Sequence, residues 1–278
     1  MSFRAPILTV LALFAFAANS ILARAALDGT SIDPVSFTLI RIASGALTLA
    51  LWVRWMSNAP RVRGSWISAL ALFGYAILFS LAYVSLSAAT GALLLFGAVQ
   101  ITMVGSAIAS GQFPSRRQFL GLALAVAGLV WLLLPGLAAP PPLPAVMMMF
   151  AGLCWGVYTL RGRGSEDPLQ ATANHFLRAM VPATVLSIIA FSSLRIDRTG
   201  VLLAIGSGAL ASGAGYAVWY AALKTIGTHT AAVVQLSVPL LTAIAGVMLL
   251  AEPLTPRIAA AGAILLLGIA LVVLRPAK

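Results

Sequence analysis

Charged side chains are scarce in this chain, and their scarcity excludes most soluble architectures. Only 8% of the 278 residues are charged and 61% are hydrophobic, whereas soluble domains carry roughly 25% charged residues. The six acidic residues all fall at predicted loops or helix ends: Asp28, Asp33, Glu166, Asp167, Asp197 and Glu252. Exchangers that swap protons for cationic substrates usually rely on a carboxylate inside the membrane. We therefore do not expect a strong preference for cations.

Cysteine clusters, metal-ligand clusters and nucleotide-binding loops are also missing. The single cysteine, Cys154, rules out a disulfide framework. The sequence contains no phosphate-binding loop and no nucleophile next to a base. We expect no metal, no cofactor and no enzymatic activity.

The basic residues are distributed in a way that indicates membrane topology. The net charge is +11, but with the N-terminus inside, most arginines and lysines of the loops fall on the inner side. The four that fall outside are Arg24, Arg195, Arg198 and Arg257. This is the positive-inside bias. We therefore place both termini in the cytoplasm of a bacterial inner membrane and expect no nucleic-acid partner.

Long apolar runs fill the chain. At about 20 residues per crossing, the sequence predicts an all-α polytopic membrane protein of ten transmembrane helices, without a soluble domain. The first run also resembles a secretory signal, but its length and its counterpart at 143–161 favour a retained helix. The predicted spans are residues 5–25, 34–56, 65–86, 89–110, 117–135, 143–161, 168–192, 200–222, 229–251 and 257–274.

The second half of the chain repeats the first. Gly74-Tyr75-Ala76 is matched by Gly215-Tyr216-Ala217, roughly 140 positions later. We predict two five-helix repeats, residues 1–137 and 138–278, which together form one membrane domain. Because five crossings are an odd number, the second repeat must enter the bilayer from the opposite side. Inverted repeats are typical of transporters that alternate access around a central site.

Aromatic side chains recur on one face of corresponding helices. Tyr75 lies near the middle of its span, where a phenol needs a polar partner or a wet cavity. The predicted cavity-lining residues are Tyr75, Tyr216, Trp219 and Tyr220. An interfacial aromatic belt or simple packing is the alternative, and Tyr83, near a helix end, fits that belt.

Polar and aromatic residues inside other spans complete the predicted substrate site. Trp155 and Tyr158 are three residues apart and share a helix face. Gln235 lies one turn before Pro239, and a proline inside a span frees a carbonyl that protein or a cavity must satisfy. The further candidates are Asn19, Gln100, Trp155, Tyr158 and Gln235, which either contact substrate or join helices.

Two arginines and one histidine lie within predicted spans. Inside hydrocarbon, an arginine costs at least about 2.5 kcal/mol unless it is paired or hydrated. Arg41 and Arg178 either tie helix-end carbonyls, which we favour, or capture a substrate carboxylate. His175 can titrate near neutral pH, so it serves either as a proton-coupling residue or as a hydrogen-bonded packing residue.

Short motifs along the whole chain resemble the drug/metabolite transporter superfamily. They are Gly111-Gln112 with Arg116-Arg117, Ala251-Glu252 with Arg257, Trp155-Gly156, and the arginines Arg41 and Arg178. The chain is most similar to the EamA-type ten-helix branch and, within it, to YddG-type amino-acid exporters. The resemblance implies a basket in which the first, third, fourth, sixth, eighth and ninth helices line a cavity. Gln112, where an acid is usual, and Phe16, where tryptophan is usual, depart from the pattern.

These observations favour one function over two others. We expect a monomeric exporter of amino acids and related small metabolites, embedded in the lipid bilayer, that works without strict proton coupling. Efflux of drugs or hydrophobic metabolites through the same cavity is an alternative of the same class. A membrane scaffold or sensor without transport is the alternative of a different class.

Overall fold

The computed structural model describes residues 4–56, 64–111, 115–134, 139–162, 167–223, 234–235 and 237–273, without the side chains of Arg4, Ala5, Tyr220, Leu223, Val272 and Val273. Within these ranges the chain is helical and contains no strand. The helices are α1 (Arg4–Gly29), α2 (Pro34–Met56), α3 (Trp66–Tyr83), α4 (Ala88–Ala109), α5 (Arg116–Leu133), α6 (Pro142–Gly162), α7 (Pro168–Ile189), α8 (Arg198–Ile205), α9 (Gly215–Leu223), α11 (Ser237–Leu250) and α12 (Pro256–Val273). A short 3₁₀ turn, η1 (Phe191–Ser193), follows α7, and a π-helix, η2 (Gly206–Ala214), joins α8 to α9.

Seven helices in the described part of the chain are long and apolar enough to cross a membrane. One of them is the continuous helical stretch from Arg198 to Trp219, and α11 and most of α12 are shorter apolar helices. The 22-residue α7 is not among the seven; it carries Asn174, His175 and Arg178. The predicted boundary between the repeats, near residue 138, lies outside the described residues.

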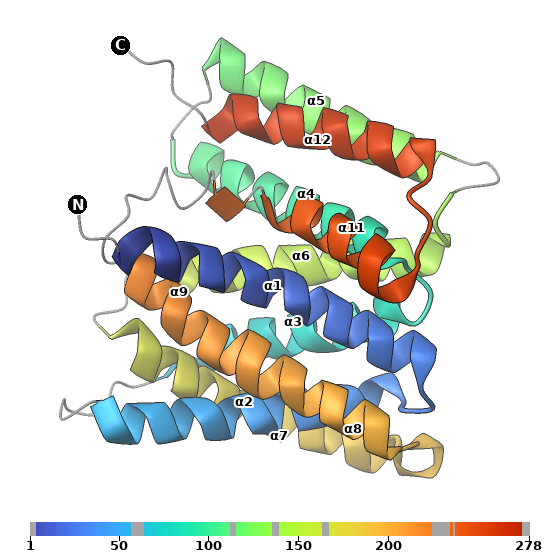
Figure 1. Ribbon diagram of the computed structural model, residues 1–278. Coiled ribbons are helices and arrows are strands. Elements are labelled where there is room, and N and C mark those ends of the chain that lie inside the picture. The colour runs from blue at the N-terminus through green and yellow to red at the C-terminus, as the bar shows by residue number, and fades with distance from the viewer. Residues whose placement is uncertain are drawn as a thin grey trace.

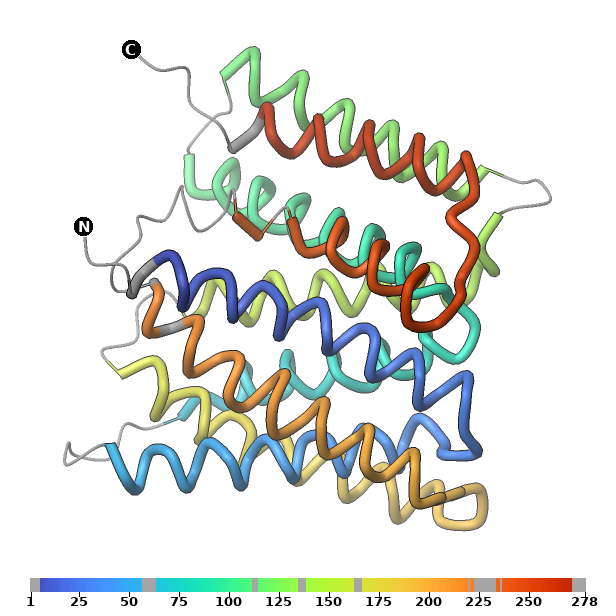
Figure 2. The backbone as a smooth tube through the Cα atoms, in the orientation of Figure 1, coloured from blue at the N-terminus to red at the C-terminus, as the bar shows by residue number. Residues whose placement is uncertain are grey.

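The helices lie side by side, and consecutive helices run in opposite directions, except that α8, η2 and α9 continue one another in one direction (Figure 1). Helix α1 begins and α12 ends at the same end of the bundle, as expected if both termini lie on one side of a membrane. Helices α5 and α12 pack against each other at one edge and reach the rest of the bundle through α4. Helices α2 and α7 pack together at the other edge, and α1, α3 and α6 lie between (Figure 2).

Ser and Asp side chains cap the N-termini of several helices. Ser115 accepts from the backbone N–H of Gln118, and the Gln118 side chain accepts in return from Ser115 N, which completes a capping box. Asp167 caps α7, whose first residue is Pro168, where a missing N–H has no consequence. Asp33 caps α2 in the same way, accepting from the N–H groups of Val35 and Ser36 at 2.8 and 3.0 Å.

Asp33 also joins two loops at one end of the bundle. Its Oδ2 accepts from the backbone N–H of Arg195 at 2.7 Å, and its own N–H donates to the carbonyl of Arg195 at 3.0 Å. Burial raises the pKa of Asp33, but hydrogen bonds from Ser36, Arg195 and Val35 outweigh burial, so the pKa lies below its usual value. The ionised carboxylate therefore stabilises the junction before α8.

Acidification is expected to remove this contribution. Because the folded-state pKa of Asp33 is lowered, its stabilising effect is complete above the unfolded pKa of about 3.9 and is lost as the pH falls through the folded value. Thermal unfolding of the purified protein between about pH 7 and pH 3 measures this loss. The Asp33→Asn variant should show a shallower pH dependence over the acid range. An identical dependence in both proteins would contradict the assignment.

The predicted span 200–222 contains a π-helix that the sequence pattern did not reveal. The segment η2 is wider than an α-helix, and π-turns occur frequently at functional sites. Gly208 within it lies against α2, where a Cβ atom would overlap the Ser44 hydroxyl and the Arg41 carbonyl oxygen. This close approach of two backbones is typical of small residues in membrane helices, and it holds Ser212 next to Arg41.

Candidate functional site

A small cavity lies at the centre of the bundle, between helices that are distant in sequence. Its lining comes from α1, α3, α4, α6, η2, α9 and the helical turn before α11, and consists of Phe16, Asn19, Ser20, Tyr75, Phe79, Leu95, Phe96, Trp155, Ala211, Ser212, Tyr216 and Gln235. The space open to water-sized molecules is about 20 Å³, which is enough for one or two waters. A metabolite therefore fits this cavity only if side chains move.

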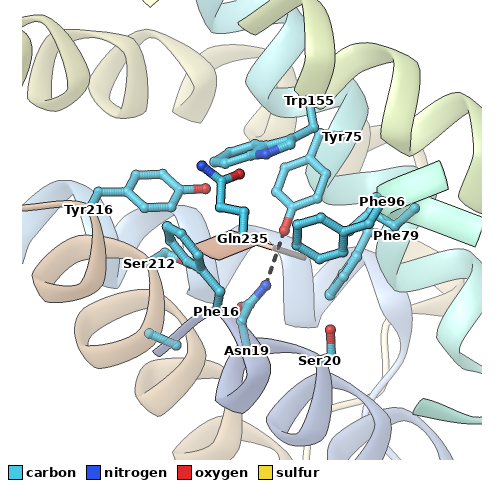
Figure 3. Close-up of a pocket in the computed structure, with 12 residues that line it drawn as sticks. Phe16, Asn19, Ser20, Tyr75, Phe79, Phe96, Trp155, Ser212, Tyr216 and Gln235 are labelled. Atoms are coloured by element: carbon cyan, nitrogen blue, oxygen red, sulfur yellow. Dashed lines mark hydrogen bonds between the residues drawn. The ribbon is translucent and has the colours of Figure 1, made fainter. Parts of the chain in front are cut away.

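Aromatic rings from four helices form one wall of this cavity. The ring centroid of Trp155 on α6 lies 4.9 Å from that of Tyr75 on α3 and 5.2 Å from that of Tyr216 on α9. Phe16 on α1 contacts Tyr216 edge-on at 6.0 Å. Figure 3 shows these rings and the amide of Gln235 pointing toward one another. Such a wall suits a flat or apolar group, because aromatic pairs prefer these separations.

A hydrogen-bond network forms the opposite, polar side. The amide nitrogen of Asn19 donates to the Tyr75 hydroxyl at 3.0 Å, as the dashed line in Figure 3 marks. Arg41 Nη2 donates to the same phenolic oxygen at 3.0 Å. Ser207 on η2 donates to the amide oxygen of Asn19 at 2.7 Å. Buried polar groups of this kind are stable only when they are hydrogen-bonded, so the network fixes the orientation of Asn19 and Tyr75.

Arg41 lies directly behind the cavity wall and is 2% exposed. Its guanidinium packs over the rings of Tyr75 and Phe79, with Cζ 5.1 and 4.9 Å from their centroids. Its Nε approaches the Ser212 hydroxyl at 3.4 Å. The expectation that Arg41 ties helix-end carbonyls is wrong, since its hydrogen bonds go to two hydroxyls that line the cavity.

The structure brings some of the predicted site residues together and separates others. Five line the cavity: Asn19, Tyr75, Trp155, Tyr216 and Gln235. Three others are buried elsewhere in the bundle. Tyr158 stacks on the far side of Trp155 at 5.5 Å, Trp219 packs against Phe16 at 5.7 Å, and Gln100 lies further along α4 than the lining residue Phe96. The side chain of Tyr220 lies outside the described residues.

Several lining residues were not predicted from sequence. They are Phe16, Ser20, Phe79, Leu95, Phe96, Ala211 and Ser212. Phe79 follows Tyr75 by four residues and so shares its helix face, a signal that could have identified it. Ser212 had no such signal, because it belonged to a pattern of small residues that indicates close helix packing.

Arg178, His175 and Tyr83 lie away from the cavity. The guanidinium of Arg178 packs over the ring of Trp66 at the start of α3, with Cζ 5.4 Å from the centroid. His175 contacts Tyr158 edge-on at 5.6 Å. Tyr83 is fully buried and donates to the carbonyl of Ala88 at 3.3 Å, so the expectation of an interfacial belt residue is wrong. The Tyr83 hydroxyl is satisfied by the nearby backbone carbonyl of Ala88 and not by contact with the membrane interface.

An ion pair joins four helices at the end of the bundle where α1 finishes. Arg24 Nε donates to Glu252 Oε1 at 2.9 Å, and Glu252 Oε2 accepts from the N–H of Ala88, at the start of α4, at 2.8 Å. Arg24 also donates to the carbonyls of Tyr83, the last residue of α3, and of Val84, its C-cap. Ala251 turns the chain back with φ of 51°, so the N–H of Glu252 bonds the carbonyl of Gly246 as in a helix C-cap.

Clusters of metal-ligating side chains are absent from the described ranges. Groups of three or more His, Cys, Asp or Glu side chains that could hold a metal ion do not occur there. The cavity provides ring faces, amides and hydroxyls, which bind small molecules reversibly.

Comparison with known proteins identifies the family. A sequence model described as the EamA-like transporter family matches residues 143–274. An "uncharacterized protein" of Pseudomonas aeruginosa is 52% identical over 270 residues, covering 97% of this chain and 94% of the relative. The chain belongs to the EamA-like transporter family. It is a multi-pass membrane transporter.

Other relatives of this EamA-like protein are more distant. Two proteins of Archaeoglobus fulgidus, each named an "uncharacterized transporter", are 25% and 27% identical over 254 and 228 residues. They cover 87% and 77% of this chain, and the matches span 89% and 78% of the relatives. A crystal structure superposes on this chain with a TM-score of 0.70 and 18% sequence identity. The match covers 96% of this chain and 97% of the chain in the crystal structure, which shows that the two share a fold.

Proposed function

We propose that this EamA-like transporter exports amino acids and related small metabolites across the bacterial inner membrane as a monomer. The observation that carries the proposal is the cavity in which Trp155, Tyr75 and Tyr216 enclose a space edged by the amides of Asn19 and Gln235. Ring faces accept the apolar side chain of an amino acid, and amides and hydroxyls accept its polar end.

Alternating access between two inverted repeats, residues 1–137 and 138–278, is the proposed mechanism. The packing of the helices supports it, because the most extensive contacts have counterparts five spans away. Helices α2, α4 and α5 pack against α7, α11 and α12, their predicted equivalents. The contact of α3 with α6 is matched by that of α1 with η2 and α9, and the contact of α4 with α6 by that of α1 with α11. Rocking of two such units would widen the small cavity toward either side.

We further propose facilitated transport down the gradient of the substrate. No acidic residue of the described chain lines the cavity, and a carboxylate is the usual proton carrier in exchangers. Purified protein in liposomes should release loaded amino acids without an imposed pH gradient. Absolute dependence on that gradient would refute this part of the proposal.

Replacing Trp155 with alanine tests the site. Loss of the central ring should lower amino-acid flux in proteoliposomes about tenfold, because ring contacts of this kind contribute about 1.4 kcal/mol. The matched control is Trp131→Ala, which removes a tryptophan from the exposed surface of α5, away from the cavity, and should leave flux unchanged.

The same liposomes separate the alternatives. Flux of hydrophobic drugs without flux of any of the amino acids would indicate drug efflux through this cavity. No flux of either class, from protein that elutes as a single folded species, would indicate a scaffold or sensor. Equal flux through the Trp155→Ala and Trp131→Ala variants would show that the substrate passes elsewhere.

A further inference from the structure

Two hydroxyls of the cavity wall are held in one orientation by Arg41. The oxygens of Tyr75 and Ser212 both accept hydrogen bonds from its guanidinium, at 3.0 and 3.4 Å. The oxygen of Tyr75 accepts a second bond from Asn19. In the described part of the chain no hydrogen bond donated by either hydroxyl is present, although both side chains are at least 95% buried. Because their oxygens face the arginine, their protons are free to point into the cavity that both residues line.

The charge of Arg41 is not neutralised within the described residues. Arg24 is the basic partner in both ion pairs found there, so Arg41 has no carboxylate partner among these residues. Its Nη1 atom is buried without a hydrogen-bond partner. A buried cation without a counter-ion is strongly unfavourable in a low-dielectric interior. Hydrogen bonds from hydroxyls that are polarised by a cation favour an anionic acceptor.

We propose that Tyr75, Ser212 and Arg41 form a subsite for the carboxylate of the transported molecule. The hydroxyls donate one hydrogen bond to each carboxylate oxygen, and the guanidinium behind them neutralises the charge directly or through these hydroxyls. This inference rests on the proposed function, which it narrows to substrates with a free carboxylate. Trp155 and Tyr216 then face the apolar part of the substrate from the other side of the cavity (Figure 3).

The proposal predicts a specific selectivity. In proteoliposomes, phenylalanine should be transported, whereas phenylalaninamide and phenethylamine, which keep the ring but lack the carboxylate, should compete at least about tenfold more weakly. Counterflow of radiolabelled phenylalanine against each unlabelled compound measures this. Equal competition by all three compounds would overturn the carboxylate subsite while leaving amino-acid transport intact.

Substitutions test whether the selectivity for a carboxylate depends on these three residues. Arg41→Gln should lower phenylalanine flux at least about tenfold and abolish the preference over phenethylamine, and Arg41→Lys should restore part of both. Tyr75→Phe and Ser212→Ala each remove one hydroxyl with little change in volume, so they test the subsite even if Arg41→Gln fails to fold. Arg178→Gln, which removes the arginine over Trp66, is the matched control and should keep the preference.

The results distinguish failure of the proposed transport function from failure of the carboxylate subsite. Absence of flux for every amino acid in the unmodified protein contradicts the proposed function itself. Flux of phenylalanine that is unchanged in Arg41→Gln, Tyr75→Phe and Ser212→Ala contradicts the carboxylate subsite alone.

Discussion

Replacing Gly208 with alanine is expected to lower the stability of the protein by about 3 kcal/mol, because the added methyl group overpacks a contact between two backbones. The new Cβ would overlap the carbonyl oxygen of Arg41, which belongs to α2 and cannot rotate away. The hydroxyl of Ser44, also overlapped, could rotate. Helix α2 must therefore separate from η2, which also moves Ser212 away from Arg41.

Gly206→Ala is the matched control for this prediction, since Gly206 belongs to the same π-helix. A Cβ there would lie 3.7 Å from a methyl group of Leu22, an ordinary van der Waals distance. Its stability should be unchanged or higher by up to about 1 kcal/mol, because alanine favours helical conformations more than glycine. Equilibrium unfolding in detergent compares the two variants. Equal stability of both would show that α2 and η2 do not pack as closely as described.

Replacing Glu252 with glutamine is expected to destabilise the protein by about 3 kcal/mol, since the mostly buried Arg24 then keeps only the exposed carboxylate of Asp28 as a counter-ion. Only 14% and 12% of the side-chain surfaces of Arg24 and Glu252 are exposed. The substitution also replaces one of the two carboxylate oxygens, which bind Arg24 and the first N–H of α4.

Asp28→Asn provides the control, because Asp28 pairs with the same arginine at 3.0 Å but is 57% exposed. An exposed pair contributes less than about 1 kcal/mol, so this variant should unfold almost as the unmodified protein does. If Asp28→Asn were as destabilising as Glu252→Gln, burial would not be what makes the Arg24–Glu252 pair strong.

The Arg24–Glu252 pair also bears on the proposed transport cycle. It connects α1, and through backbone contacts α3 and α4, to the end of α11. Helices α1, α3 and α4 fall in the first predicted repeat and α11 in the second, so the proposed rocking of the repeats would separate the pair if it opened the cavity toward this end of the bundle.

Much of the fold could be predicted from the sequence, because membrane spans depend on local properties. The length of an apolar run alone indicates whether the run can cross the hydrocarbon core. An Asp or Ser just before the run caps the N-terminus of its helix. The sequence analysis predicted a span at residues 168–192, but α7 is not among the seven helices of the described chain that are long and apolar enough to cross a membrane; it carries Asn174, His175 and Arg178.

The site could be predicted only in part. A tyrosine or tryptophan in mid-span needs a partner or a cavity whatever the fold, so Tyr75, Trp155 and Tyr216 stood out by residue type alone. Residue type did not separate Gln235, which lines the cavity, from Gln100, which does not. Gln100 shares a helix face with the lining residue Phe96, four positions earlier, but it lies one turn further along α4. The position of each amide relative to the cavity is set by how its helix packs against the neighbouring helices.

Sequence alone determined that this protein is a polytopic membrane protein whose spans contain aromatic and amide side chains. It could do so because the hydropathy and the charge of a segment depend only on the residues of that segment. Only the tertiary structure decided the surroundings of the two arginines that lie within predicted spans. Arg41 meets Tyr75 and Ser212, which lie 34 and 171 positions away, whereas Arg178 meets Trp66 at the start of α3. The chemistry of each guanidinium is the same, and its neighbours come from helices that only folding brings together.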